Sequence, residues 1–153
     1  MKKLLFIFIL MALVLTACAA GAASGSQTEI GQNKEKWQDA NISHYRYHLS
    51  ITCFCVFSQD MPLIIEVQDG EVVSMEFQSG NEIDAGSREL FDKYATIDRL
   101  FAELEAGMNG AADEVIAKYD PTYGFPTEVT IDFVKEATDD ELYFSLSNFE
   151  ELP

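Results

Sequence analysis

The sequence predicts an α+β domain in which an antiparallel meandering sheet of about six strands carries two helices packed on one face. Alternating apolar and polar residues predict strands in two groups of three. A segment with an apolar anchor or an apolar stripe at helical spacing precedes each group. The expected order of elements is therefore α-βββ-α-βββ.

The first group begins with a short helix over residues 33–42, anchored by Trp37. The period then changes from helical spacing to alternation, which is typical of a strand with one buried face. The residues expected to face the core in this strand are Tyr45, Tyr47, Leu49 and Ile51.

A β-hairpin is expected next, with Asp69-Gly70 at its turn. The apolar faces of its strands are Leu63, Ile65 and Val67, then Val73, Met75 and Phe77. A two-residue loop would place Val72 rather than Val73 on the shared face. The parity of the apolar residues therefore favours a three-residue loop, Gln68 to Gly70, with a bulge at the glycine.

The second group follows a loop with a helical turn near residues 88–93. Thr96 is a predicted N-cap, and Gly107 and Gly110 are expected to end the helix. The apolar stripe of this helix comprises Ile97, Leu100, Phe101, Leu104 and Met108. The inward residues of the three closing strands are expected to be Val115, Ala117 and Tyr119, then Val129, Ile131 and Phe133, then Leu142, Phe144 and Leu146. The shared element order of residues 33–79 and 96–149 suggests a structural repeat without residue identity.

The N-terminus predicts export. Residues 1–17 form a lipoprotein signal peptide, because two lysines precede an apolar run of about 12 residues that is too short to span a bilayer. The run ends in Leu-Thr-Ala before Cys18, which resembles the lipobox of bacterial lipoproteins, whose cysteine is acylated. An ordinary secretory signal is the alternative. Residues 18–32 are expected to be a flexible tether, and residues 33–153 a single domain.

The charge of the chain limits its partners. Ten basic and 26 acidic residues give a formal net charge of −16, and loss of Lys2 and Lys3 with the signal makes it −18. This charge argues against binding to nucleic acid or to an anionic lipid surface. The expected association is with a membrane, through the N-terminal lipid alone, while a protein partner remains unidentified.

Cys53 and Cys55 are the only cysteines besides Cys18. A disulfide between them is the leading interpretation, because disulfides persist outside the cytoplasm. Residues two apart in an ideal strand have Cα atoms at or beyond the limit for a bridge, so a bend at Phe54 would be needed. Two free buried thiols, or a redox or Cu(I) site, are the alternatives.

His44 and His48 share the polar face of the first strand, opposite the side of the two cysteines. They are a weak candidate for binding, and a solvated strand face is the favoured interpretation. Neither histidine has an arranged serine or cysteine partner, so no catalytic residues, cofactor or metal site are predicted. The other residues expected on this open face are Arg46, Glu66, Thr130, Asp132, Tyr143 and Ser145.

The segment DPTYGFP, residues 120–126, is the most distinctive loop. Tyr123 and Phe125 could project outward as aromatic anchors for a partner. The favoured alternative is a hairpin loop whose aromatic residues cap the core, because Pro121 and Gly124 already serve the turn.

Several features in order resemble an uncharacterised bacterial lipoprotein family, domain-of-unknown-function family 6174. The matching features are Trp37, Tyr45, Cys53-Phe54-Cys55, the hairpin Val67 to Gly70, TIDRLF at 96–101, YDPTYGFPTEVTID at 119–132 and the acidic turn 139–141. Phe125 stands where the family pattern has tyrosine. The resemblance covers nearly the whole domain and implies no established activity.

The sequence thus predicts a non-enzymatic, lipid-anchored domain outside the cytoplasm, on the cell membrane or outer membrane of a bacterium. The polar sheet face or the 120–126 loop would bind a partner. A thiol redox or copper-handling protein that uses Cys53 and Cys55 is the alternative, and a structural cell-envelope unit is a third possibility.

Overall fold

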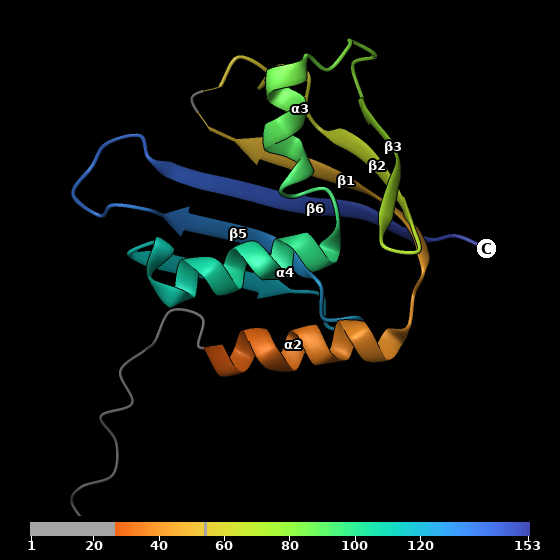
Figure 1. The fold of residues 1–153 in the computed structure, drawn as a ribbon, viewed down its shortest axis with the longest axis horizontal. Coiled ribbons are helices and arrows are strands. Elements are labelled where there is room, and N and C mark those ends of the chain that lie inside the picture. The colour runs from red at the N-terminus through yellow and green to blue at the C-terminus, as the bar shows by residue number, and fades with distance from the viewer. Residues whose placement is uncertain (1–26, 54) are drawn as a thin grey trace, which may run out of the picture.

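A computed structural model describes residues 27–53 and 55–153. In these residues the strands form one six-stranded antiparallel sheet with the order β3-β2-β1-β6-β5-β4. Helices α3 and α4 lie over one face of the sheet, and α2 runs beside α4 (Figure 1). The predicted α+β class and antiparallel sheet are confirmed, with the element order α-βββ-αα-βββ.

The described residues form one helix more than the two predicted, because the segment expected to hold a helical turn near residues 88–93 forms α3. The helices are α2 (Gln27–Ala40), α3 (Ala85–Asp92) and α4 (Ile97–Ala106), which continues into the π-helical segment η1 (Gly107–Ala111). The hydroxyl of Thr96 accepts a hydrogen bond from the backbone N–H of Arg99 at 3.1 Å, so the predicted N-cap is confirmed. Gly110 has a φ of 101° and ends the helical segment.

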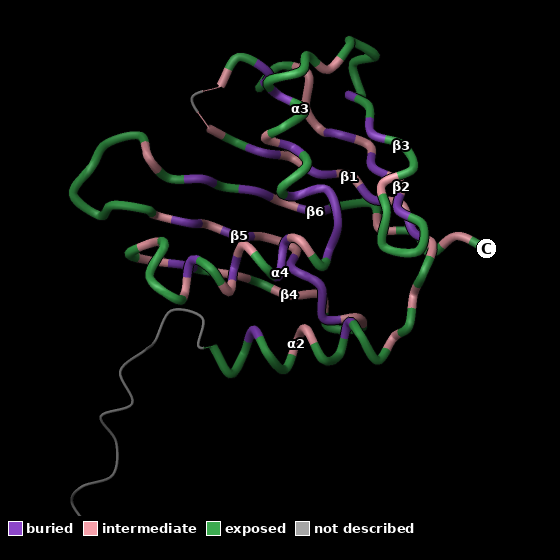
Figure 2. The backbone as a smooth tube through the Cα atoms, viewed as in Figure 1, coloured by how far each residue is buried: buried purple, intermediate pink, exposed green. Residues whose placement is uncertain are grey.

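The strands alternate in burial as they alternate in sequence. They are β1 (His44–Thr52), β2 (Leu63–Gln68), β3 (Glu71–Phe77), β4 (Glu114–Tyr119), β5 (Pro126–Asp132) and β6 (Glu141–Glu151). The inward residues predicted for β1 and β6 are all buried, as Figure 2 shows along both strands. Phe133 is an exception, because it lies beyond the end of β5 and is 40% exposed, so its predicted inward position was wrong.

The β2–β3 hairpin differs from the prediction in its turn. Its loop is the two residues Asp69 and Gly70, whose φ angles of 52° and 81° suit a two-residue hairpin turn. Glu66 pairs with Ser74 and Val67 with Val72, so Val73 is the extra residue of a bulge. The predicted three-residue loop was therefore wrong. The bulge at Val73, rather than a longer loop, places Met75 and Phe77 on the same face as Leu63 and Ile65. Met75 and Phe77 are buried, whereas Val73 is exposed.

The strand order contradicts the suggested structural repeat. β1 opens the first half and β6 closes the second, yet they are neighbours at the centre of the sheet. The first meander runs from the centre outward and the second from the edge inward. Each half crosses the sheet in the same order, but three antiparallel pairings separate β1 from β4, so the first strands of the two halves run in opposite directions. Because the helices lie on one face, no rotation superposes one half on the other.

Helix α2 begins earlier than expected. It starts at Gln27, so residues 27–32 are helical rather than part of a flexible tether. Ile30 is buried with Trp37, which explains why this turn belongs to the domain. Residues 18–26 of the expected tether, and Cys18 itself, lie outside the described residues.

The core between helices and sheet is rich in aromatic side chains, and the hydroxyls of Tyr45 and Tyr47 within it are hydrogen-bonded, whereas that of Tyr119 has no partner in the described residues. The Tyr47 hydroxyl donates to the Tyr94 carbonyl at 3.2 Å, and the Tyr45 hydroxyl accepts from the backbone N–H of Ile97 at 3.2 Å. Burial raises the pKa of Tyr45 to about 12 and that of Tyr47 well above its ordinary value. Both phenols therefore stay neutral and hold the connection before α4 onto β1.

Candidate binding surface

The sheet face turned away from the helices is open and polar, as predicted. None of the residues expected there is fully buried, and their side chains line up across strands in rows set by the register. One row is Ile116, Thr130, Tyr143 and Thr52. The next row toward one end of the sheet is Glu114, Asp132 and Glu141. An uncovered face of this kind is available to a partner.

The two histidines are engaged separately. His44 Nε2 lies 3.0 Å from a Glu66 carboxylate oxygen, and its Nδ1 lies 3.0 Å from the Pro153 carbonyl. The Glu66 hydrogen bond, and then that carbonyl, raise the pKa of His44. His48 Nδ1 lies 3.2 Å from the Asn148 side-chain amide. Residues four apart on a strand are about 13 Å apart, so the two rings do not form one site.

Cys53 and Cys55 come together just beyond β1. Their sulfur atoms lie at disulfide distance, and their Cα atoms are 5.2 Å apart, which is shorter than in an extended strand. The backbone N–H of Cys55 donates to the Cys53 carbonyl at 2.8 Å. The predicted bend at Phe54 lies outside the described residues. Both cysteines pack partly buried against the core.

The aromatic residues of the 120–126 loop cap the core, which is the favoured sequence interpretation. Phe125 is 4% exposed and stacks on Phe149 with ring centroids 4.6 Å apart. Tyr123 is half-buried and packs on the same ring at 5.6 Å. Phe125 is therefore a packing residue, and only Tyr123 retains a surface for a ligand.

A shallow cleft of about 400 Å³ lies beside this loop. It is lined in part by Asp120, Thr122, Tyr123, Ser147, Asn148 and Phe149. Sequence reasoning missed its β6 side. The available signal was the loss of alternation after Leu146, where Asn148 takes a φ of 51° and the β1–β6 register shifts.

A second, larger groove of about 630 Å³ separates the start of β3 from α3 and α4. Its charged lining is Arg88, Lys93 and Arg99 together with Glu71, Asp92 and Glu103. These charges are balanced, although the whole chain is strongly acidic. No local sequence pattern predicts this groove, because its residues come from three separate elements.

Carboxylates gather where β4 begins and β5 ends. Asp140 accepts a hydrogen bond from the backbone N–H of Val134 at 2.6 Å, and Asp113 accepts from that of Lys135 at 3.0 Å. One oxygen of Asp132 and one of Asp140 are shielded from solvent and have no hydrogen-bond partner. Burial raises the pKa of Asp132, and neighbouring carboxylates, Asp140 first, raise it further.

The described residues lack two further features, a metal-binding cluster and a membrane-spanning helix. No three His, Cys, Asp or Glu side chains within residues 27–53 and 55–153 are arranged to hold a metal ion. No helix in this part of the chain combines the length and the apolar character needed to cross a membrane.

The fold and the open face together define a class of protein: a small α+β domain whose antiparallel sheet is covered by helices on one face only. Residues 29–151 match the family of unknown function DUF6174, and the chain therefore belongs to that family. No curated protein and no solved structure matches it.

Proposed function

We propose that this chain is a lipid-anchored bacterial lipoprotein outside the cytoplasm, and that its domain is a non-enzymatic binding unit. The observation that carries the binding role is the sheet face that α3 and α4 leave open. The anchor rests on the sequence that ends at Cys18. The chain belongs to a family of unknown function, and this membership is compatible with both the lipid anchor and the binding role.

The position of α2 supports the anchored arrangement. The Gln27 side-chain amide donates to Asn109 at 2.7 Å, which places the start of α2 beside η1. Eight residues separate Cys18 from Gln27, so even a fully extended chain of nine residue-to-residue steps spans only about 30 Å. The end of the sheet where β4 begins would then lie nearest to the membrane.

The contacts of the histidines support a binding rather than a catalytic role. A general base needs a proton donor or nucleophile within hydrogen-bond reach. His44 contacts Glu66 and the Pro153 carbonyl, and His48 contacts Asn148. These partners fix two rings on an open face and supply no serine or thiol nucleophile.

The anchor is tested by intact mass and by incorporation of a labelled fatty acid in the producing bacterium. We expect a diacyl or triacyl mass on Cys18. In Cys18→Ser both this mass and the retention of the chain in the membrane should be lost. A mature chain that begins elsewhere and carries no acyl group would refute the anchor. The binding role is tested by substitutions that reverse the charge of the open face. Binding of a defined partner should be lost in these variants.

The cysteine pair supports a second candidate, thiol redox or copper handling. The pair lies at the edge of the domain next to Val56, which is 94% exposed, so a reductant or a soft metal ion could reach it. Titration of the reduced chain with Cu(I) tests this role. Binding of one ion that is absent in Cys53→Ser would support copper handling, and no binding would exclude it.

A further inference from the structure

We propose that the end of the open face formed by the starts of β4 and β6 and the end of β5 docks a basic protein segment with apolar anchors. We call this area the docking end and define it by Ile116, Tyr143, Glu114, Asp132 and Glu141. The inference rests on the proposed binding function and adds the place and the chemistry of the partner.

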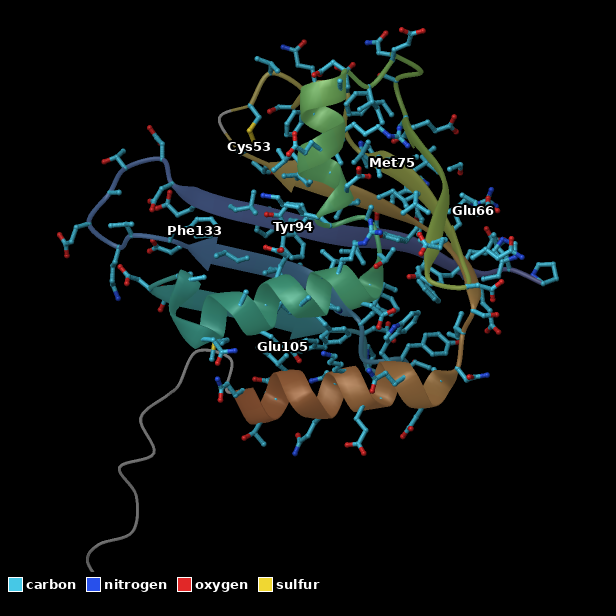
Figure 3. All side chains as sticks on the ribbon, viewed as in Figure 1. Cys53, Glu66, Met75, Tyr94, Glu105 and Phe133 are labelled. Atoms are coloured by element: carbon cyan, nitrogen blue, oxygen red, sulfur yellow. A yellow bond between two sulfur atoms is a disulfide. The ribbon has the colours of Figure 1, made fainter. Side chains whose placement is uncertain are left out.

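Two of the residues that define the docking end are large apolar side chains exposed on an otherwise polar face. Thr130 pairs with both Ile116 and Tyr143, so the three lie in one cross-strand row on the same face. Ile116 is 47% exposed and Tyr143 is 36% exposed. Phe133 and Val134 directly follow β5 and are also exposed, and Figure 3 shows Phe133 at the opposite end of the sheet from Glu66. Exposed apolar side chains in one cross-strand row, such as Ile116 and Tyr143, mark an interaction site more often than scattered single residues do.

The same end has uncompensated negative charge. Glu114, Asp132 and Glu141 form the row two residues further along the strands, about 7 Å from the apolar row. None of the three is in an ion pair in the described structure, whereas Glu66, Glu105, Glu128 and Glu150 each are. Arginine or lysine side chains of a partner would pair with the accessible carboxylate oxygens of this row.

This combination favours a protein over a lipid surface. Protein interfaces have an apolar centre and a polar rim, and the two rows give that pattern on one face. A bilayer with anionic lipid would repel the carboxylates and would leave them without donors. A second copy of this chain carries the same negative charge and is disfavoured for the same reason.

The test measures binding of the full chain, purified in detergent, to three labelled octapeptides by fluorescence anisotropy. One alternates lysine with leucine, one lysine with serine, and one glutamate with leucine. We expect the lysine–leucine peptide to bind about tenfold more tightly than either of the others. Ile116→Ser with Tyr143→Ser should reduce that affinity about tenfold, because both apolar contacts are lost.

Charge reversal provides the matched control. Glu114→Lys with Glu141→Lys should weaken binding of the lysine–leucine peptide and strengthen binding of the glutamate–leucine peptide. Glu35→Lys with Asp39→Lys changes two exposed residues of α2 by the same net charge and should change affinity by less than about twofold. Thermal unfolding of each variant establishes that it folds.

Three results would overturn the proposal. An equal loss of peptide affinity in Glu35→Lys with Asp39→Lys would show that the charge attraction is non-specific. Equal affinities for the lysine–serine and lysine–leucine peptides would show that the apolar row does not contribute to binding. Binding to phosphatidylcholine vesicles that depends on Ile116 and Tyr143, without peptide binding, would assign the surface to lipid instead. The peptide test does not depend on acylation of Cys18, so its failure and failure of the anchor are distinguishable.

Discussion

A Cβ atom on Gly124 would lie 2.5 Å from the carbonyl oxygen of Asn33, so helix α2 crosses the 120–126 loop with no room for a side chain. Gly124 also has a φ of 81°, a conformation that other residues adopt only with strain. The loop and the helix therefore depend on this one glycine. Nearby, the Lys36 ammonium donates to the Pro121 carbonyl and adds a second contact between them.

Gly124→Ala should lower the free energy of unfolding by about 2–4 kcal/mol, since backbone strain and steric overlap add together. Gly70→Ala has a similar φ of 81° but open space around the new Cβ, so it should cost only about 1–2 kcal/mol. Gly31→Ala, in α2 with open space, should be neutral or stabilising. Urea unfolding measures all three, and equal costs at positions 124 and 70 would disprove the steric role of Asn33.

Stability should depend on pH through His44. Because its pKa is raised by Glu66, the protonated ring favours the folded state. This contribution is complete below the ordinary value of 6.5 and is lost as pH rises through the folded-state pKa. NMR titration should show the raised value in the native chain and in His48→Gln, and a lower value in Glu66→Gln. An unchanged titration in Glu66→Gln would contradict this assignment.

Ionisation of Asp132 should lower the stability of the fold, whereas ionisation of a typical hydrogen-bonded surface carboxylate raises it. The pKa of Asp132 is raised above 3.8, so ionisation opposes folding, and stability is lost as pH rises through the folded-state pKa. Asp132→Asn should therefore raise the unfolding midpoint at neutral pH more than at acid pH. Glu136→Gln, a change in the exposed β5–β6 turn, is the control. An equal effect of both variants would point to net charge alone.

The purified chain should contain no free thiol at positions 53 and 55 before reduction, and two after it. The Cα separation permits the bridge, and the proposed location outside the cytoplasm favours it. The ring is small because the cysteines are two residues apart, so Cys53→Ser with Cys55→Ser should cost only about 1–2 kcal/mol. Thiol titration and urea unfolding check these values. Two free thiols in the unreduced chain would contradict the bridge.

Much of the fold follows from local periodicity, and the differences have local causes. Alternation identified the inward residues of β1 correctly, because a half-buried strand requires that pattern. It failed in the β2–β3 hairpin, because one extra residue, Val73, shifts parity as effectively as a longer loop does. It missed the first turns of α2, where Ile30 is the one buried residue before Trp37.

The candidate surfaces were harder to predict than the strands. The polar residues of the open face were placed correctly, but their rows depend on pairings between distant strands. Nothing local associates Ile116 with Tyr143, which share a row only because each pairs with Thr130. Tyr123 and Phe125 stood out in the sequence, yet Phe149, the ring on which they pack, is brought there by the shift in the β1–β6 register.

The central position of β1 and β6 has a consequence for the order of folding. Neighbouring strands within each half are close in sequence, whereas the β1–β6 seam joins residues as distant as Tyr45 and Glu151. Closing such a long loop costs more entropy than closing a hairpin, and long-range pairing slows folding. Each meander can therefore assemble early, while β1 keeps one unpaired edge until β6 has been synthesised. A chain that emerges N-terminus first would thus expose one edge of the central strand β1 until β6 arrives.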